Sequence, residues 1–194
     1  FVFREPVWAQ LHSGDYNATA DGSPWSSERF YAEPSKHVST FHRYLPHCDV
    51  LIHCAFWDPR APVLFTKEEM ANPADFRISV IADVTCDING SIPSTVRASS
   101  IDEPFYGYDP ATQQTGGDPF ATTNITVMAV NNLPCELPRD SSEDFGKNLL
   151  ERVLPSLLVQ DKDGLLERAT IAKDGKLAGR FGYLGDYVED SGKV

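Results

Sequence analysis

Two short apolar runs dominate the hydrophobic pattern, and each is rich in β-branched residues and ends in small polar ones. The first lies within Phe76–Gly90 and ends at Asp87, and the second is Ile125–Val130 and ends at Asn132. Nearly continuous apolar runs are typical of strands buried on both faces, as in a parallel sheet covered by helices. Ligands bind beyond the carboxyl ends of such strands. We therefore predict two adjacent parallel strands whose polar ends share one crevice.

A third strand is predicted at Cys48–Phe56, and helix signals alternate with the strands. The expected helices are a short one capped by Ser35 with Val38, Phe41 and Leu45 on one face, a brief one with the capping box Thr66–Glu69, and a long one starting at Asp140 (capping-box spacing with Glu143) or Ser141 with the stripe Phe145, Leu149, Val153 and Leu157. Pro46 should end the first helix, and Pro155 should kink or end the last. Alternating helices and strands imply parallel pairing through crossover connections.

The remaining segments lack a clear period. Trp8–Pro34 and Asn89–Thr123 are expected to be long irregular loops, and the tail should hold a turn at Asp174-Gly175 and a weak amphipathic helix over 177–188. The predicted fold class is α/β, the second half of a doubly wound, Rossmann-like parallel sheet with long loops and a C-terminal helical segment. We expect a loop-rich lead-in with a short helix over 1–47, the sheet over 48–160 and a C-terminal segment packing toward a substrate domain over 161–194.

Charge and cysteine content narrow the class of protein. The formal net charge of −11 argues against nucleic acid or an anionic membrane as a partner. The sequence contains no apolar run of transmembrane length and no signal-peptide pattern. Cys48, Cys54, Cys86 and Cys135 form no close Cys-x-x-Cys pair. Free, buried thiols in a reducing cytoplasm are the expected state, so the localisation we predict is cytoplasmic.

Few residues are candidates for chemistry. The histidine spacing does not favour a metal site, and Cys86 and Cys135 adjoin carboxylates that make a thiol a poor nucleophile. Neither Gly-x-Gly-x-x-Gly nor a Walker loop occurs, so we assign no catalytic and no metal residue. Asp83 lies in the apolar register of its strand and is expected to be a buried, hydrogen-bonded group. Asp87 and Asn132 either stabilise their turns or meet a ligand.

Several segments resemble the alanine dehydrogenase and transhydrogenase family, and in particular its saccharopine dehydrogenase branch of the lysine–2-oxoglutarate reductase type. The matching segments, in order, are Phe56–Pro59, Leu64–Glu68, Ile81–Gly90 (Ile-Ala-Asp-Val-Thr-Cys-Asp-Ile-Asn-Gly), Asp102–Pro110 and Asn132–Arg139. The resemblance implies a two-domain enzyme with an NAD(P)-binding doubly wound domain in the middle of its chain. This sequence would supply the second half of that domain and the closing segment.

The resemblance also implies which residues approach the cofactor, NAD or NADP. They are Ala55 and Phe56 at one strand end, Asp87 near the nicotinamide ribose, and Asn132 and Leu133 near the nicotinamide. Gly90-Ser91 departs from the family's glycine pair. The family's phosphate-binding turn and its acid/base Lys and His have no counterpart in this sequence, so we expect weak or absent cofactor binding by this segment alone.

Three functions remain open. The first is the C-terminal portion of a saccharopine-forming oxidoreductase that condenses lysine with 2-oxoglutarate, so that the partners are an amino acid and a keto acid. The second is a non-catalytic stand-alone module that binds a partner or a metabolite, and the third is an alanine-dehydrogenase-like enzyme. The opening Phe-Val-Phe-Arg-Glu-Pro looks like the end of a strand, which suggests a fragment. Because a split sheet exposes an unpaired edge, we expect a homo-oligomer or pairing with the missing half.

Overall fold

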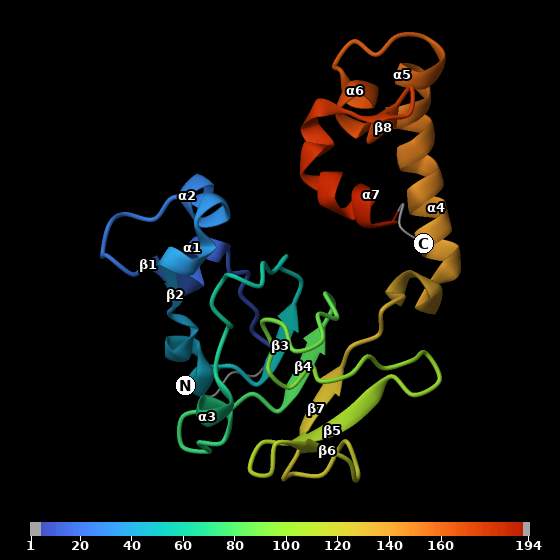
Figure 1. Cartoon of the computed structure of the whole chain (residues 1–194). Helices are drawn as coiled ribbons and strands as arrows, with labels where there is room; N and C mark the ends of the chain where they lie inside the picture. The colour runs from blue at the N-terminus through green and yellow to red at the C-terminus, as the bar shows by residue number, and fades with distance from the viewer. Residues whose placement is uncertain (1–4, 192–194) are drawn as a thin grey trace. The chain divides into compact units, whose positions relative to one another are not determined.

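The computed structural model describes residues 5–191, with side chains described through Glu189. The chain divides into two compact units, with the boundary between Leu133 and Pro134 (Figure 1). The first unit contains a five-stranded sheet and the second consists mainly of helices.

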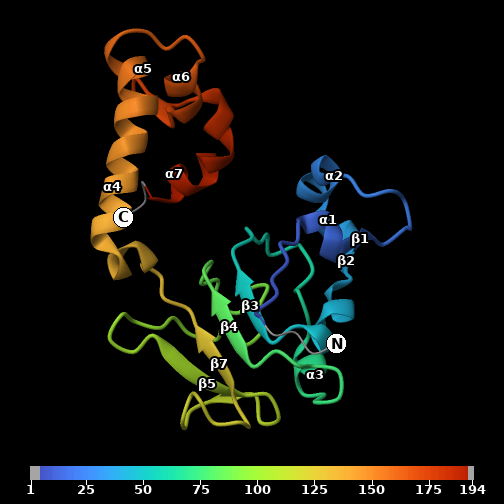
Figure 2. The ribbon, with the colours of Figure 1, turned by 180° about the vertical axis from the view of Figure 1, so that it is seen from behind.

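The sheet has the strand order β3-β4-β7-β5-β6. Its three parallel strands are β3 (Val50–His53), β4 (Val80–Asp83) and β7 (Ile125–Met128). Figure 2 shows their arrowheads pointing the same way. In register, Ile81 lies beside Leu51 on one side and Val127 on the other. The predicted parallel pairing of the two apolar runs is therefore confirmed.

The other side of the sheet differs from the prediction, because β5 (Phe105–Asp109) pairs antiparallel with β7 and β6 (Gln114–Thr115) pairs antiparallel with β5. The sheet is thus mixed, and the prediction of an irregular segment over 89–123 is wrong at these strands. β5 reads Phe-Tyr-Gly-Tyr-Asp, and aromatic residues are enriched in strands. The surrounding Pro, Gly and Asp residues obscured that signal.

One face of the sheet carries the core of this unit. Its buried side chains include Ile81, Tyr106 and Val127 from the strands, with Phe41 and Phe65 packed against them. The third predicted strand is present as β3, and it is open on one face, where Val50 is 54% and Ile52 is 67% exposed. The described residues of this unit leave that part of the second face uncovered.

The N-terminal region is more ordered than predicted. It contains α1 (Ser13–Tyr16), α2 (Ser27–Ala32) and the antiparallel pair β1 (Asn17–Thr19) and β2 (His37–Ser39), followed by a 3₁₀ helix, Phe41–His47. The helix predicted from Ser35 is wrong, because a 3₁₀ turn, Pro34–Lys36, and β2 occupy its first half. Phe41 and Leu45 are buried as expected, whereas Val38 is exposed. The Thr66–Glu69 capping box is confirmed at the start of α3 (Lys67–Met70).

The second unit begins within the 3₁₀ turn Leu133–Glu136. Its elements are α4 (Pro138–Asn148), a π-helical segment (Leu149–Val153), α5 (Leu154–Leu158), α6 (Leu165–Ala169), the hairpin β8 (Ala172–Lys173) and β9 (Lys176–Leu177), a 3₁₀ segment (Gly179–Leu184) and α7 (Gly185–Ser191). The predicted caps at Asp140 and Ser141 are wrong, because Leu137 is the N-cap and Pro138 starts the helix. The π-helical segment, which ends two residues before Pro155, is the disturbance of the helix that the proline predicts.

The tail of this unit is not the continuous helix predicted over 177–188, because a hairpin and a 3₁₀ segment take its first half. The predicted turn at Asp174-Gly175 is confirmed. Both residues have positive φ angles, 53° and 74°, as a two-residue type I′ hairpin turn requires.

Candidate functional site

The five candidate cofactor-binding residues lie beyond the carboxyl ends of the three parallel strands. Ala55 and Phe56 follow β3, Asp87 follows β4, and Asn132 and Leu133 follow β7. Because the three strands are parallel neighbours, these ends lie at one edge of the sheet (Figure 2). Phe56 and Asn132 are exposed and Asp87 is half-buried, so this edge presents an aromatic ring, an amide and a carboxylate.

The turn that carries Asp87 has a tightly specified backbone. Cys86 and Asn89 both adopt positive φ angles, 54° and 53°. A Cβ atom at Gly90 would lie 2.5 Å from the Cβ of Asp87 and 2.7 Å from its carbonyl oxygen, so only glycine fits there. The amide of Gly90 donates to the Asp87 carbonyl at 2.8 Å, and the amide of Asn89 donates to the Thr95 carbonyl at 2.8 Å.

The carboxylate of Asp83, at the end of β4, ties this turn to the sheet. Asp83 is 1% exposed. Its Oδ1 accepts from the hydroxyl of Thr85 at 2.7 Å and from the amide of Thr85 at 3.2 Å, and its Oδ2 accepts from the hydroxyl of Thr95 at 2.7 Å. This confirms the prediction of a buried, hydrogen-bonded group.

The imidazole of His53, at the end of β3, joins Asp83 to Ser91. Nδ1 of His53 lies 3.3 Å from Oδ1 of Asp83, and Nε2 lies 3.3 Å from Oγ of Ser91. Because an ionised carboxylate can only accept, Nδ1 of His53 donates to Asp83, and Nε2 makes the hydrogen bond with the Ser91 hydroxyl. We call these five side chains the Asp83 network: Asp83, His53, Thr85, Ser91 and Thr95.

The Asp83 network favours the ionised carboxylate. Burial raises the pKa of Asp83, but the hydrogen bonds from His53, Thr95 and Thr85 outweigh that effect and hold its pKa below the ordinary value. The order carboxylate, imidazole, hydroxyl also occurs in serine hydrolases. Here the hydroxyl belongs to Ser91, which is buried at 5% exposure, so the arrangement suits a structural connection.

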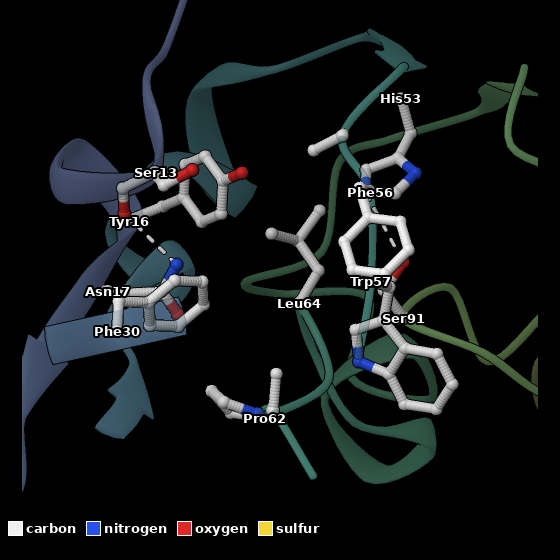
Figure 3. Close-up of a pocket in the computed structure, with 12 residues that line it drawn as sticks. Ser13, Tyr16, Asn17, Phe30, His53, Phe56, Trp57, Pro62, Leu64 and Ser91 are labelled. Carbon is white, nitrogen blue, oxygen red and sulfur yellow. Dashed lines mark hydrogen bonds between the residues drawn. The ribbon is translucent and has the colours of Figure 1, made fainter. Parts of the chain in front are cut away.

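A small pocket lies beside this network in the first unit. His53 and Ser91 line it together with Trp57, Leu64 and others, as Figure 3 shows. Nε1 of Trp57 is buried and has no hydrogen-bond partner among the described residues. A buried donor without a partner is costly, and an acceptor group of a ligand would satisfy it.

Sequence reasoning missed His53 because a single histidine in an apolar strand carries no motif. The available signal was that polar His53 and polar Asp83 both interrupt apolar strands, and they lie opposite each other in the parallel register. The prediction for the cysteines is partly wrong. All four thiols are free, but Cys54 and Cys135 are exposed and Cys48 and Cys86 are half-buried. Cys86 lies in the turn, where burial raises its pKa and nearby Asp83 and Asp87 raise it further.

Between residues 5 and 191, no helix is long and apolar enough to cross a membrane. In the same range, no group of three or more His, Cys, Asp or Glu side chains is arranged to hold a metal ion.

A sheet with parallel strands, crossover connections and polar strand ends defines the Rossmann-like class of α/β domains. Comparison with known proteins identifies the family within that class. The alanine dehydrogenase/PNT C-terminal domain family matches residues 25–179, and the chain belongs to this family.

The relatives are larger enzymes. The chain is 31% identical over 162 residues to "Alpha-aminoadipic semialdehyde synthase" from Arabidopsis thaliana, which covers 80% of this chain and 15% of that protein. It is 26% identical to the mitochondrial enzyme of that name from Bos taurus, covering 78% of this chain and 19% of that protein. It is 30% identical to "Saccharopine dehydrogenase [NAD(+), L-lysine-forming]" from Emericella nidulans, covering 65% of this chain and 32% of that protein. The chain therefore spans a third or less of each of these relatives.

Proposed function

We propose that this chain is the C-terminal portion of the cofactor-binding domain of a saccharopine-forming, NAD(P)-dependent oxidoreductase. The observation that carries this proposal is the edge formed by the ends of β3, β4 and β7, where the candidate residues of three separate segments follow adjacent parallel strands. Family membership supports the redox class, and the names of the relatives support a substrate in lysine metabolism.

The residues at this edge suit the nicotinamide half of such a cofactor. A half-buried carboxylate such as Asp87 can accept from a ribose hydroxyl, and the amide of Asn132 can both donate and accept. Ala55 and Phe56 provide an apolar surface, and Leu133 adds a second one. When bound, the cofactor supplies a hydride that reduces the imine of lysine and 2-oxoglutarate. The chain's own part is to orient the cofactor.

The same proposal covers assembly and compartment. β3 is an outermost strand of the sheet, with one side free of a neighbouring strand, and its Val50 and Ile52 are exposed in this unit. Both features support pairing with the remainder of a longer enzyme or with a second copy. Four free thiols support a reducing compartment such as the cytoplasm.

The test is oxidation of NADH and of NADPH by the longest protein that the reading frame encodes. We expect oxidation that requires lysine and 2-oxoglutarate together. Oxidation with pyruvate and ammonia would instead favour an alanine-dehydrogenase-like enzyme. No oxidation under either condition, with a folded protein, would favour a non-catalytic module that binds a partner or metabolite.

A further inference from the structure

The Asp83 network has a geometry that the cofactor assignment does not use. The segment that carries Asp87 leaves the sheet after β4 and comes back to Asp83 at Thr95. The carboxylate of Asp83 accepts from the hydroxyl of Thr85 at the start of this segment and from the hydroxyl of Thr95 at its end. One buried group therefore holds both ends of the segment that carries Asp87.

His53 adds a connection from the neighbouring strand. Its ring lies between Asp83 and Ser91, at 3.3 Å from each, so it links β3 to the carboxylate and to a residue within the turn. Between these attachments the backbone uses positive φ angles at Cys86 and Asn89, which are uncommon for residues other than glycine. Such a backbone persists where its surroundings specify it strongly.

We propose that His53, acting through Asp83 and Ser91, is a positioning residue that holds the Asp87 turn in its cofactor-binding conformation. The role at the cofactor rests on the function proposed above. A turn that is fixed before binding loses less conformational freedom when the cofactor binds. If the turn moved, the Asp87 carboxylate would lose the hydrogen bond proposed above with the ribose hydroxyl of the cofactor. His53 acts through the contacts that its ring makes to Asp83 and Ser91.

The first test uses this chain alone and measures amide hydrogen exchange by NMR. In His53→Ala we expect the amides of Asn89 and Gly90 to exchange about tenfold faster or more, because opening of the turn becomes easier. The amide of Thr40, which donates to the carbonyl of Tyr16, should be unchanged. His53→Asn should largely restore protection, because its side-chain amide can stand where Nδ1 donates to Asp83.

A matched control is His37→Ala, which removes another buried histidine of the same unit from outside the Asp83 network. It should leave the exchange of Asn89 and Gly90 unchanged. If His53→Ala fails to fold, the exchange of the Asn89 and Gly90 amides is compared between His53→Asn and His53→Leu, and it should be faster in the leucine variant. Unchanged exchange at both amides in folded His53→Ala or His53→Leu would overturn the proposal.

The second test uses the longest encoded protein and a double-mutant cycle on the KM for NAD(P)H. We expect His53→Ala to raise this KM about tenfold with little change in the KM for lysine, and to have no further effect once Asp87 is alanine. Additive effects would mean that His53 does not act through Asp87, and would overturn the proposal. If the long protein has no oxidoreductase activity, the proposed function fails, and the exchange experiment alone decides whether His53 holds the turn.

Discussion

At the scale of single residues, Asp83 is the group whose environment has the clearest physical consequence. It is buried, it accepts hydrogen bonds from three side chains and its pKa lies below the ordinary value. A depressed pKa contributes stability that is present above the ordinary aspartate pKa, about 3.9, and is lost as the pH falls through the folded-state value.

Asp83→Asn should therefore change both stability and its pH dependence. At pH 7 the free energy of unfolding should fall by about 1–3 kcal/mol, because buried donors lose a charged acceptor. As the pH falls below about 4, the wild type should lose more stability than the variant. Urea unfolding followed by tryptophan fluorescence reports on the first unit, since Trp8, Trp25 and Trp57 all belong to it. If the free energy of unfolding falls equally in the two proteins as the pH is lowered, Asp83 does not have the depressed pKa described here.

Gly90 gives a steric test of the turn. Gly90→Ala should lower the free energy of unfolding of the first unit by about 1–3 kcal/mol. The new methyl group would clash with the Cβ atom and the carbonyl oxygen of Asp87, and relieving the clash would require the backbone to shift. The measurement is again urea unfolding by tryptophan fluorescence. A variant as stable as the wild type would mean that the turn is looser than the structure describes.

At the scale of elements, the parallel strands and the capping box of α3 were predictable, whereas β5 and the start of α4 were not. Ile78–Val84 and Ile125–Val130 are short runs rich in β-branched residues, and both contain a parallel strand. β5 was missed because its five residues are surrounded by turn formers. The start of α4 was missed because the polar residues that suggested an N-cap lie within the helix, which begins earlier, at Pro138. Asp87 and Asn132 followed from the strand ends, whereas Ala55, Phe56 and Leu133 followed from the family resemblance. His53 did not, because its role depends on a partner 30 residues away in the chain.

The second unit offers an element-scale prediction at Gly146, within α4. Among the described residues, nothing lies within 4 Å of a Cβ atom placed at Gly146, and its φ angle is not in the positive range. Gly146→Ala should stabilise the helix by about 0.5–1 kcal/mol, because alanine loses less backbone entropy on folding. Thermal unfolding followed by circular dichroism at 222 nm measures it. A lower midpoint than the wild type would show that the site tolerates no side chain.

At the scale of the whole molecule, the chain spans at most a third of the relatives compared above, and its sequence contains no glycine-rich phosphate turn. We predict that this segment alone binds NADH and NADPH weakly, without saturation below about 1 mM, because the contacts to the pyrophosphate are absent. Titration followed by tryptophan fluorescence, to which Trp57 contributes, measures this. Saturable binding in the micromolar range would mean that the residues of this chain suffice.

The central claim is that the turn after β4 presents Asp87 to the nicotinamide ribose. The most direct measurement is the Kd for NAD(P)H of the longest encoded protein and of its Asp87→Ala variant, with Asp75→Ala as a control at an exposed aspartate that precedes β4, on the amino side of the parallel strands. Loss of a charged hydrogen bond, about 1.5–3 kcal/mol, predicts a Kd raised by roughly 10- to 100-fold in Asp87→Ala and unchanged in Asp75→Ala. Equal Kd values for Asp87→Ala and the wild type would contradict the claim.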